Sequence, residues 1–289
     1  MQINKQQESI LNEFQCQRVR STDSACLLSI SGPIIDGTNR SLLIDHFRSD
    51  KHIADDKAGV LASYVISNKN NDVLLFFSIR CGELFEKIDH QKMILSHNAL
   101  VGVNTLKNSA KVSKDEHDIA LQAIKNALNA GLSYEDFRYY AEKKRTYIGD
   151  VSKEPSKEIS RVSVVYSGVE LKFFGINDNA KDFWGSLNLP RKMGETLFWY
   201  FIVPILEELR EIVGCQYLYL FAADREADGH LVNYYRTALH INAPAKLSSN
   251  KPFFDYNSVF LYQDIDYLSK QRLQFLSTFN PDIEDSEIV

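Results

Sequence analysis

The chain has 289 residues, of which 44% are hydrophobic and 25% charged, and its formal net charge is −5. These values are typical of a globular protein with a sizeable core, and they argue against nucleic acid as a partner because no broad basic surface is expected. No apolar run is long enough to cross a membrane, and the polar start MQINKQQESILNEF is unlike a signal peptide. We therefore expect a cytoplasmic protein without a membrane partner.

The cysteines and histidines give no sign of a metal site. The four cysteines are scattered without a Cys-x-x-Cys pair, and none of the seven histidines belongs to a His-Glu-x-x-His motif. Zinc sites in proteins usually show one of these spacings, so we expect no metal cofactor.

The first half of the chain predicts helices followed by a hairpin. Short helices are expected at 6–14 and 39–51, the second of them amphipathic. Two apolar runs, 60–67 and 73–83, flank the polar turn NKNND, which is the pattern of two antiparallel strands.

The stretch 85–158 predicts a helical insertion. Ser113 and Glu116 form a capping box before an alanine-rich helix that ends at Gly131, and Ser133 begins a second capping box. The polar sequence GDVSKEPSKEIS then leads out of the insertion.

The second half predicts alternating strands and helices. The long strand 161–177, where Gly168 suggests a bulge, precedes the helix 195–213, and Gly214 ends that helix. The strand 217–223, a short helix at 231–239, the strand 257–264, a helix at 266–279 and a loose acidic tail at 280–289 follow. A strand, helix and strand in this order demand a parallel pair. We therefore expect one α/β domain over 1–289, with a mixed, mostly antiparallel sheet flanked by helices.

The sequence LNLPRKMGET, residues 187–196, lies where an apolar helix begins. Backbone N–H groups from Lys192 to Thr196 could face a pyrophosphate there, with Gly194 allowing close approach. The alternative is a loop in which Gly194 and Glu195 only start a buried helix.

Two regions of this half resemble the GNAT N-acetyltransferase superfamily. Leu187, Arg191 and Gly194 match its pyrophosphate loop, whereas Thr196 replaces the last small residue and a longer segment precedes the loop. Further on, YLYLFAAD followed by DGHLVNYYRTALHI resembles the strand and the tyrosine-bearing helix of the family, without the usual glycine after the tyrosine. The resemblance covers 161–264 and suggests a divergent member with a helical insertion.

The resemblance implies an acetyl-CoA site where two parallel strands are splayed apart. It places Tyr235 at the position of the proton-donating tyrosine and Tyr234 beside it. It implies pantetheine pairing along the long strand near Leu171 and Phe173. The remaining cofactor-binding residues that it implies are Arg191, Lys192, Met193, Gly194, Glu195, Thr196 and Tyr234.

Glu170 is the candidate catalytic base. A carboxylate in the middle of the apolar strand VYSGVELKFF is costly unless it is paired or used. Strand alternation puts Glu170 on the face of Gly168 and Lys172. The alternative is a structural ion pair with Lys172 or Arg161.

These observations predict an acetyltransferase that moves an acetyl group from acetyl-CoA to a primary amine by direct transfer in a ternary complex. The acceptor is a small molecule or a peptide. An alternative is a non-catalytic CoA-binding or protein-interaction module with the same fold. A toxin-like acetyltransferase acting on aminoacyl-tRNA is a further alternative, which the acidic charge balance does not favour.

Overall fold

The computed structural model describes residues 2–19, 30, 39–87, 95, 98–99, 101–103, 105–106, 113–133, 162–223, 229–244, 246–250 and 258–280. The chain divides into two compact units. The first unit comprises Met1–Glu83, Tyr166–Pro244 and Asn250–Val289, and the second comprises Leu84–Val165 and Ala245–Ser249. The predicted insertion, 85–158, lies within the second unit, which also contains segments from the ends of neighbouring strands. A single domain with an inserted segment stays a prediction.

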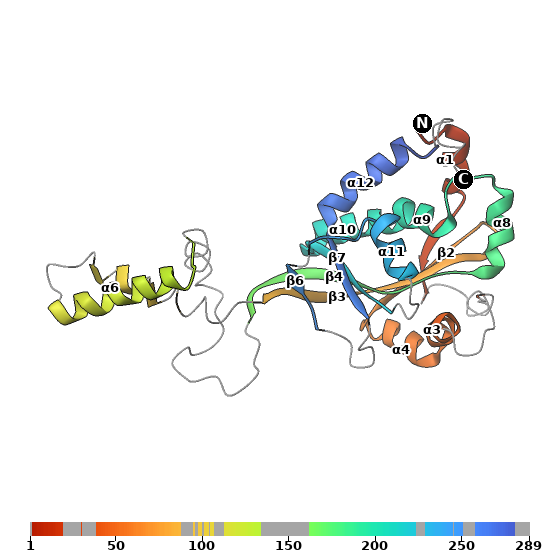
Figure 1. Ribbon diagram of the computed structural model, residues 1–289. Helices are drawn as coiled ribbons and strands as arrows, with labels where there is room; N and C mark the ends of the chain where they lie inside the picture. The colour runs from red at the N-terminus through yellow and green to blue at the C-terminus, as the bar shows by residue number, and fades with distance from the viewer. Residues whose placement is uncertain are drawn as a thin grey trace. The chain divides into compact units, whose positions relative to one another are not determined.

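A sheet of seven strands forms the centre of the fold (Figure 1). Its neighbours follow the order β1-β2-β3-β4-β5-β7, and β6 pairs with β3. The strands are β1 (Gln15–Arg18), β2 (Ala62–Ser67), β3 (Val73–Lys87), β4 (Val162–Ile176), β5 (Tyr217–Ala222), β6 (Leu247–Ser248) and β7 (Val259–Asp264).

The helices precede, connect and follow these strands. They are α1 (Lys5–Asn12), α3 (Asn39–Arg48), α4 (Asp50–Lys57), α6 (Lys114–Asn129), α8 (Lys181–Ser186), α9 (Met193–Leu197), α10 (Val203–Val213), α11 (His230–Thr237) and α12 (Ile265–Ser277). A short 3-10 turn, η4 (Asp178–Ala180), precedes α8, and the π-helical turn η5 (Phe198–Ile202) joins α9 to α10.

All but one of the strand pairs are antiparallel. β1 with β2, β2 with β3, β3 with β6 and β5 with β7 are antiparallel, whereas β4 and β5 are parallel. β4 is also antiparallel to β3. Glu170 forms an ion pair with Arg80, while Asn177, directly after β4, donates its N–H to the carbonyl of Leu74, which comes earlier in β3. The predicted α/β fold class, a mixed and mostly antiparallel sheet flanked by helices, is confirmed.

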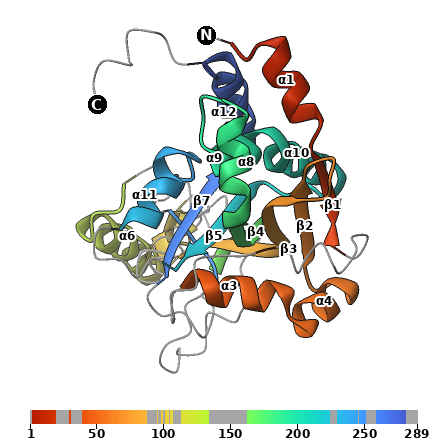
Figure 2. The same cartoon turned by 90° about the vertical axis from the view of Figure 1, so that its right-hand side faces the viewer.

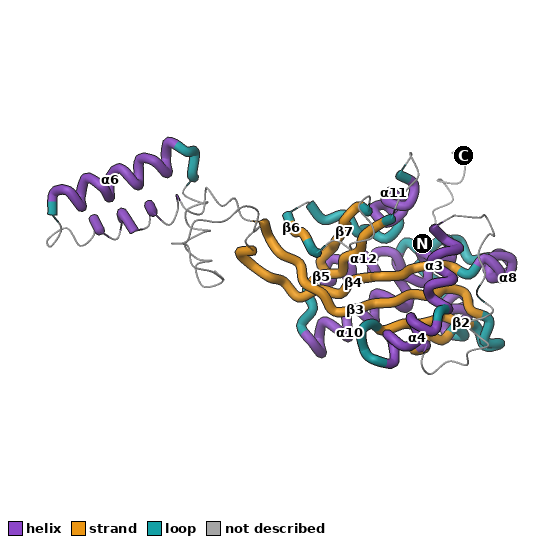
Figure 3. The backbone as a smooth tube through the Cα atoms, turned by 90° about the horizontal axis from the view of Figure 1, so that it is seen from below, coloured by secondary structure: helices purple, strands orange, loops and turns teal. Residues whose placement is uncertain are grey.

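Helices cover both faces of the sheet (Figures 1 and 2). One face, which we call the α10 face, packs Leu171, Leu218 and Leu220 in the same cluster as residues of α9, α10, α11 and α12. The other, the α3 face, packs Phe76 of β3 against Phe47 of α3. Seen from below, α3 and α4 lie across this second face (Figure 3). Both layers follow from strands whose two sides are apolar.

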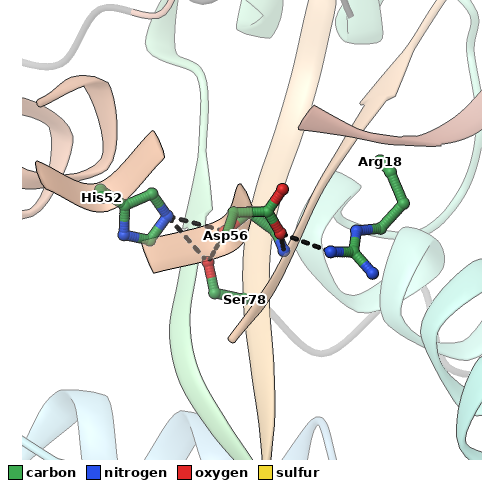
Figure 4. A network of polar contacts seen from close by, with 5 residues as sticks. Arg18, His52, Asp56 and Ser78 are labelled. Atoms are coloured by element: carbon green, nitrogen blue, oxygen red, sulfur yellow. Dashed lines mark hydrogen bonds and ion pairs between the residues drawn. The ribbon is translucent and has the colours of Figure 1, made fainter. Parts of the chain in front are cut away.

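A buried polar network attaches α4 to the sheet on the α3 face (Figure 4). The Oγ atom of Ser63 lies 2.8 Å from His52 Nε2 and 2.9 Å from Ser78 Oγ. Asp56 accepts hydrogen bonds from Ser63 N at 2.9 Å and from an Arg18 Nη at 2.6 Å. Burial is the first cause that lowers the pKa of His52, to about 4. The imidazole is therefore neutral at neutral pH.

Several expected elements agree with the structure and others do not. The capping box of Ser113 and Glu116 and the left-handed stop at Gly214 are both present. The predicted helix 39–51 is instead two helices, because Ser49 caps a new one, α4. β1, β6 and α8 were not predicted, and the helix predicted after Ser133 and the tail 281–289 lie outside the described residues.

Candidate active site

The parallel strands β4 and β5 pair over a short length only. The register joins Gly168 to Tyr217, Val169 to Leu218 and Glu170 to Tyr219. Beyond these pairs β4 continues to Ile176 and β5 to Ala222 without pairing to each other, while the other edge of β5 pairs with β7 along its whole length. The two strands thus part after Glu170 and Tyr219. A strand edge released in this way offers backbone N–H and C=O groups to a ligand.

Just past this point β4 carries an irregularity. Val169 and Leu171 share the cluster of the α10 face with Phe174, which regular alternation cannot achieve. Phe173 contacts His46 and His52 on the α3 face, with ring centroids 5.1 and 5.3 Å apart.

Lys172 also belongs to the α3 face, because its ammonium is 5.9 Å from the ring centroid of Phe173, which contacts the two histidines there. Two successive residues, Lys172 and Phe173, therefore point to the same side, as at a β-bulge. The prediction of a bulge at Gly168 is wrong for the pairing with β5, because Gly168 pairs with that strand in regular register.

A helix begins beside the released half of β4. α9 starts at Met193, and its N-cap, Lys192, makes no capping hydrogen bond with its side chain. The first N–H groups of a helix have no acceptor within the helix, and the dipole makes this end favourable for anions. The N–H of Thr196 already donates to Lys192 O at 2.9 Å. The amides left for a ligand are thus those of Met193, Gly194 and Glu195.

Thr196 adds an unsatisfied polar group at the helix start. Its side chain is fully buried, and its Oγ1 atom has no hydrogen-bond partner among the described residues. A buried hydroxyl without a partner costs about 1–3 kcal/mol.

Gly194 holds the helix start close to β4 and to α11. A Cβ atom at this position would lie 2.9 Å from Tyr234 Oη, 3.4 Å from Ile176 Cγ2 and 3.9 Å from Phe174 Cζ. Only glycine allows this approach without displacement of its neighbours. The contact brings the start of α9, the released half of β4 and the tyrosine pair together.

The two tyrosines of α11 sit in different surroundings. Tyr235 is 8% exposed and packs against Phe174, with ring centroids 6.4 Å apart. Tyr234 is half-buried against Gly194. Burial raises the pKa of both hydroxyls, so each remains protonated at neutral pH.

The turn after α11 adopts a left-handed conformation without the glycine that the resemblance led us to expect there. His240 adopts a left-handed conformation with φ of 53°, and Ile241 N donates to Tyr235 O at 2.9 Å. This is the geometry that a glycine normally supplies at a helix end.

Glu170 lies on the α3 face and is paired. Its carboxylate is buried, and Oε2 accepts a hydrogen bond from Arg80 Nε at 2.5 Å. The ion pair considered from the sequence therefore exists, but its partner is Arg80 rather than Lys172. Arg161, the other partner considered, lies outside the described residues. Arg80 was not singled out, although it is a charged residue in the apolar run VLLFFSIRCGE, the same signal that drew attention to Glu170.

The structure gathers some of the expected site residues and separates others. Gly194, Glu195, Thr196 and Tyr234 lie around the start of α9. Burial raises the pKa of Glu195, and the charges of Arg191 and Lys192 oppose that shift. Met193 is buried and Lys192 is exposed.

Arg191 points away from the helix start. Its Nε and one Nη donate to Phe279 O at 3.1 Å and to Thr278 O at 2.6 Å. The side chain therefore ties the loop to the end of α12, so only its main chain is left near the predicted cradle.

Glu170 and Tyr235, the two expected catalytic residues, lie on opposite faces of the sheet. Leu171, the neighbour of Glu170 in β4, is buried on the α10 face in the same cluster as Tyr235. A ligand could reach both Glu170 and Tyr235 only where β4 and β5 part.

Within the described part of the chain, no helix is long and apolar enough to cross a membrane. The same residues contain no group of three or more His, Cys, Asp or Glu side chains placed to hold a metal ion.

No protein-family model matches the sequence, and no curated protein matches it. Among solved structures, a mutant of KacT with a tyrosine replaced by phenylalanine is 12% identical over 90% of this chain and 99% of that chain, with a TM-score of 0.41. A similar mutant of the AtaT toxin, bound to the C-terminus of the antitoxin AtaR and acetyl-CoA, is 9% identical over 89% and 97%, with a TM-score of 0.43. AtaT complexed with acetyl-methionyl-tRNAfMet is 10% identical over 90% and 99%, with a TM-score of 0.44. Likenesses this weak do not carry an inference about activity.

The topology of the chain itself is more informative. It combines a mostly antiparallel sheet, one parallel pair that parts after Glu170 and Tyr219, and a helix start beside the released half of β4. These are features that the sequence resemblance implied for the cofactor site.

Proposed function

We propose that the chain is an acetyl-CoA-dependent N-acetyltransferase that transfers an acetyl group directly to a primary amine in a ternary complex. The observation that carries this proposal is the parting of β4 and β5 beside the uncapped start of α9. Such a junction offers a strand edge to an extended ligand and a helix N-terminus to its phosphates.

The start of α9 would hold the pyrophosphate of the cofactor. The N–H groups of Met193, Gly194 and Glu195 supply donors, and the exposed Lys192 supplies positive charge. The unpartnered Oγ1 of Thr196 and the missing Cβ of Gly194 support the same assignment. Arg191 would contribute through its main chain.

The released half of β4 would hold the pantetheine arm. From Leu171 to Gly175 the strand has left β5, so its edge there can bond to the amides of the arm. Phe173 points to the α3 face and would contribute through its main chain.

Acetyl-CoA supplies the acetyl group as an activated thioester. Tyr235 would donate its hydroxyl proton to the departing sulfur, because burial keeps that hydroxyl protonated at neutral pH. Glu170 would accept the proton that the attacking amine loses as its nitrogen binds the acetyl carbon. Tyr234, beside Gly194, would complete the cofactor cradle.

The ion pair of Glu170 and Arg80 favours a second candidate, a CoA-binding or protein-interaction module without catalysis. A carboxylate held by an arginine on the face opposite Tyr235 can be purely structural. The two candidates share the cofactor cradle and differ in chemistry alone.

Calorimetry and thiol release separate the possibilities. Acetyl-CoA should bind the protein, and Lys192→Gln should weaken binding by about tenfold because a charge-assisted contact is lost. Lys270→Gln, an exposed residue of α12, is the matched control and should bind as the wild type does. No binding would remove the cofactor assignment.

Release of free thiol with an amine panel then tests catalysis. The panel includes small amines, peptides and an aminoacyl-tRNA, the last being the acceptor of the alternative considered from the sequence. Turnover that falls in Glu170→Gln and in Tyr235→Phe supports the enzyme. Binding without thiol release for any member supports the non-catalytic module.

A further inference from the structure

The α3 face has an excess of positive charge beside the point where β4 and β5 part. Arg80 and Lys172 lie there with one buried carboxylate, Glu170, and Arg80 already bonds to it. Partial burial lowers the pKa of Lys172, the charge of Arg80 lowers it further, and Glu170 opposes the shift. Lys51 and Asp55 of α4 also influence Lys172, in opposite directions.

Neither cation is fully used by the protein. Lys172 is exposed, forms no ion pair with the described residues, and is 5.9 Å from the ring centroid of Phe173. Arg80 is 35% exposed, and its Nε donates a hydrogen bond to Glu170. The guanidinium fork and the ammonium are thus available to an anion.

An aromatic surface continues from this charged site across β5 and β7. Tyr219 is level with Glu170 in the register, and a Cβ at Gly82 would lie 1.8 Å from Tyr219 Oη, so its ring leans toward the strand of Arg80. Tyr219 contacts Phe221 and Phe260 with ring centroids 6.1 and 5.9 Å apart. Phe221 and Phe260 are each only half-buried.

We propose that this face receives the acceptor, and that the acceptor carries an oxyanion, carboxylate or phosphate, and a planar ring in addition to its amine. This inference rests on the proposed function and names the substrate class of that site. A plain alkyl amine would bring a further cation to a place where Arg80 and Lys172 already outnumber Glu170, which is unfavourable. An oxyanion reverses that balance, and the half-exposed rings of β5 and β7 can pack a planar group.

Direct binding tests the inference without requiring turnover. NMR titrations with the full chain and unacetylated CoA compare matched ligands that differ in the oxyanion alone. Tyrosine against tyramine tests the carboxylate, and phosphoethanolamine against ethanolamine tests the phosphate. The oxyanion-bearing member of at least one pair should bind about tenfold more tightly, because charge-assisted hydrogen bonds are strong.

Variants assign the preference to the site. Lys172→Gln is the principal one, since no described carboxylate loses a partner, and it should reduce the preference several-fold. Arg80→Lys keeps the charge beside Glu170 and loses the fork, so it should reduce the preference while the chain stays folded. Lys270→Gln should leave the preference unchanged. Phe260→Leu should weaken tyrosine and leave phosphoethanolamine as before.

Equal binding within both pairs would overturn the inference, as would a preference for the amines without an oxyanion. A preference that survives both Lys172→Gln and Arg80→Lys would place the anion elsewhere and overturn it too. Failure of the proposed function has a different signature, namely no binding of acetyl-CoA or no thiol release. The ligand preference is measured independently of both.

Discussion

The two faces of the sheet differ in the side chains that β4 contributes to them. On the α10 face the strand contributes Leu171 and Phe174, and Phe174 packs against Tyr235, whose hydroxyl burial keeps protonated. On the α3 face the same strand contributes Glu170 and Lys172, close to Arg80 and two histidines.

The difference shows how one strand can serve two purposes. The tightly packed α10 face would offer a cofactor the start of α9 with the exposed Lys192, whereas the α3 face would offer an acceptor the charged side chains of Glu170, Lys172 and Arg80. The two faces adjoin where β4 and β5 part. We expect substitutions of side chains on one face to leave the side chains of the other face in place.

The largest expected effect comes from breaking the ion pair of the α3 face. Arg80→Met leaves the carboxylate of Glu170 buried without a partner, which should lower the free energy of unfolding by about 3 kcal/mol. This is the lower end of the usual range, because Arg80 is partly exposed. Urea denaturation measures the change.

Lys172→Met is the matched control for this variant. Lys172 lies on the same face of the sheet as Arg80 but forms no ion pair among the described residues. The free energy of unfolding should therefore change by less than about 0.5 kcal/mol. Equal losses in the two variants would contradict the picture of one used and one unused cation.

Acid should destabilise the α3 face through His52. The folded pKa is about 4 and the unfolded value about 6.5, so between these values the unfolded chain takes up a proton that the folded chain does not. Stability therefore falls as the pH drops through this window, by about 2 kcal/mol at pH 5 relative to pH 7.

Denaturation curves of His52→Gln at the two pH values should lack this part of the loss. His117→Gln, on the exposed surface of α6, should retain the acid sensitivity of the wild type. An unchanged pH dependence in His52→Gln would show that His52 is not the group responsible.

Overpacking should disturb the α10 face less. Gly194→Ala places a methyl group 2.9 Å from Tyr234 Oη, and we expect a loss of about 1–2 kcal/mol in stability together with weaker acetyl-CoA binding. The double variant Gly194→Ala with Tyr234→Phe removes the contacting oxygen. Calorimetry should show part of the binding restored. If the double variant binds no better than Gly194→Ala, the contact with Tyr234 does not set the position of the helix start.

The smallest effect is expected at Thr196, where the unfolding free energy and the affinity for acetyl-CoA should change in opposite directions. Thr196→Val removes a buried hydroxyl without a partner, so the unfolding free energy should rise by about 1 kcal/mol or less. Acetyl-CoA should bind less tightly, because a hydroxyl available to the ligand is lost. A gain in both stability and affinity would place Thr196 outside the cofactor cradle.

Local patterns in the sequence predicted much of the fold. The hairpin, the capping box at Ser113 and the stop at Gly214 depend on residues close together in the chain, and each is present. The parallel pair followed from the order of strand, helix and strand. The isolated charge of Glu170 indicated a position that needs a partner, and it has one.

Features that depend on distant residues were less accessible. The partner of Glu170 is 90 residues away in the sequence, and its identity depends on the register of β3 with β4. The glycine favours a bulge at Gly168, although the bulge occurs at Lys172 and Phe173, where no glycine signals it. The contact of Arg191 with the end of α12 joins segments that no local pattern connects, so the sequence alone assigns its side chain to the cofactor.

The irregularity in β4 has a counterpart in the helix that packs on it. The ring of Phe174, directly after the bulge, meets that of Phe198, the first residue of the π-helical turn η5, edge to face at a centroid distance of 6.2 Å. A β-bulge and a π-helical turn each accommodate an extra residue without lengthening their element. The two irregularities thus meet at this pair of rings, and we expect removal of either one alone to displace its ring from the other. We expect chains related by descent to keep both additions or to lack both.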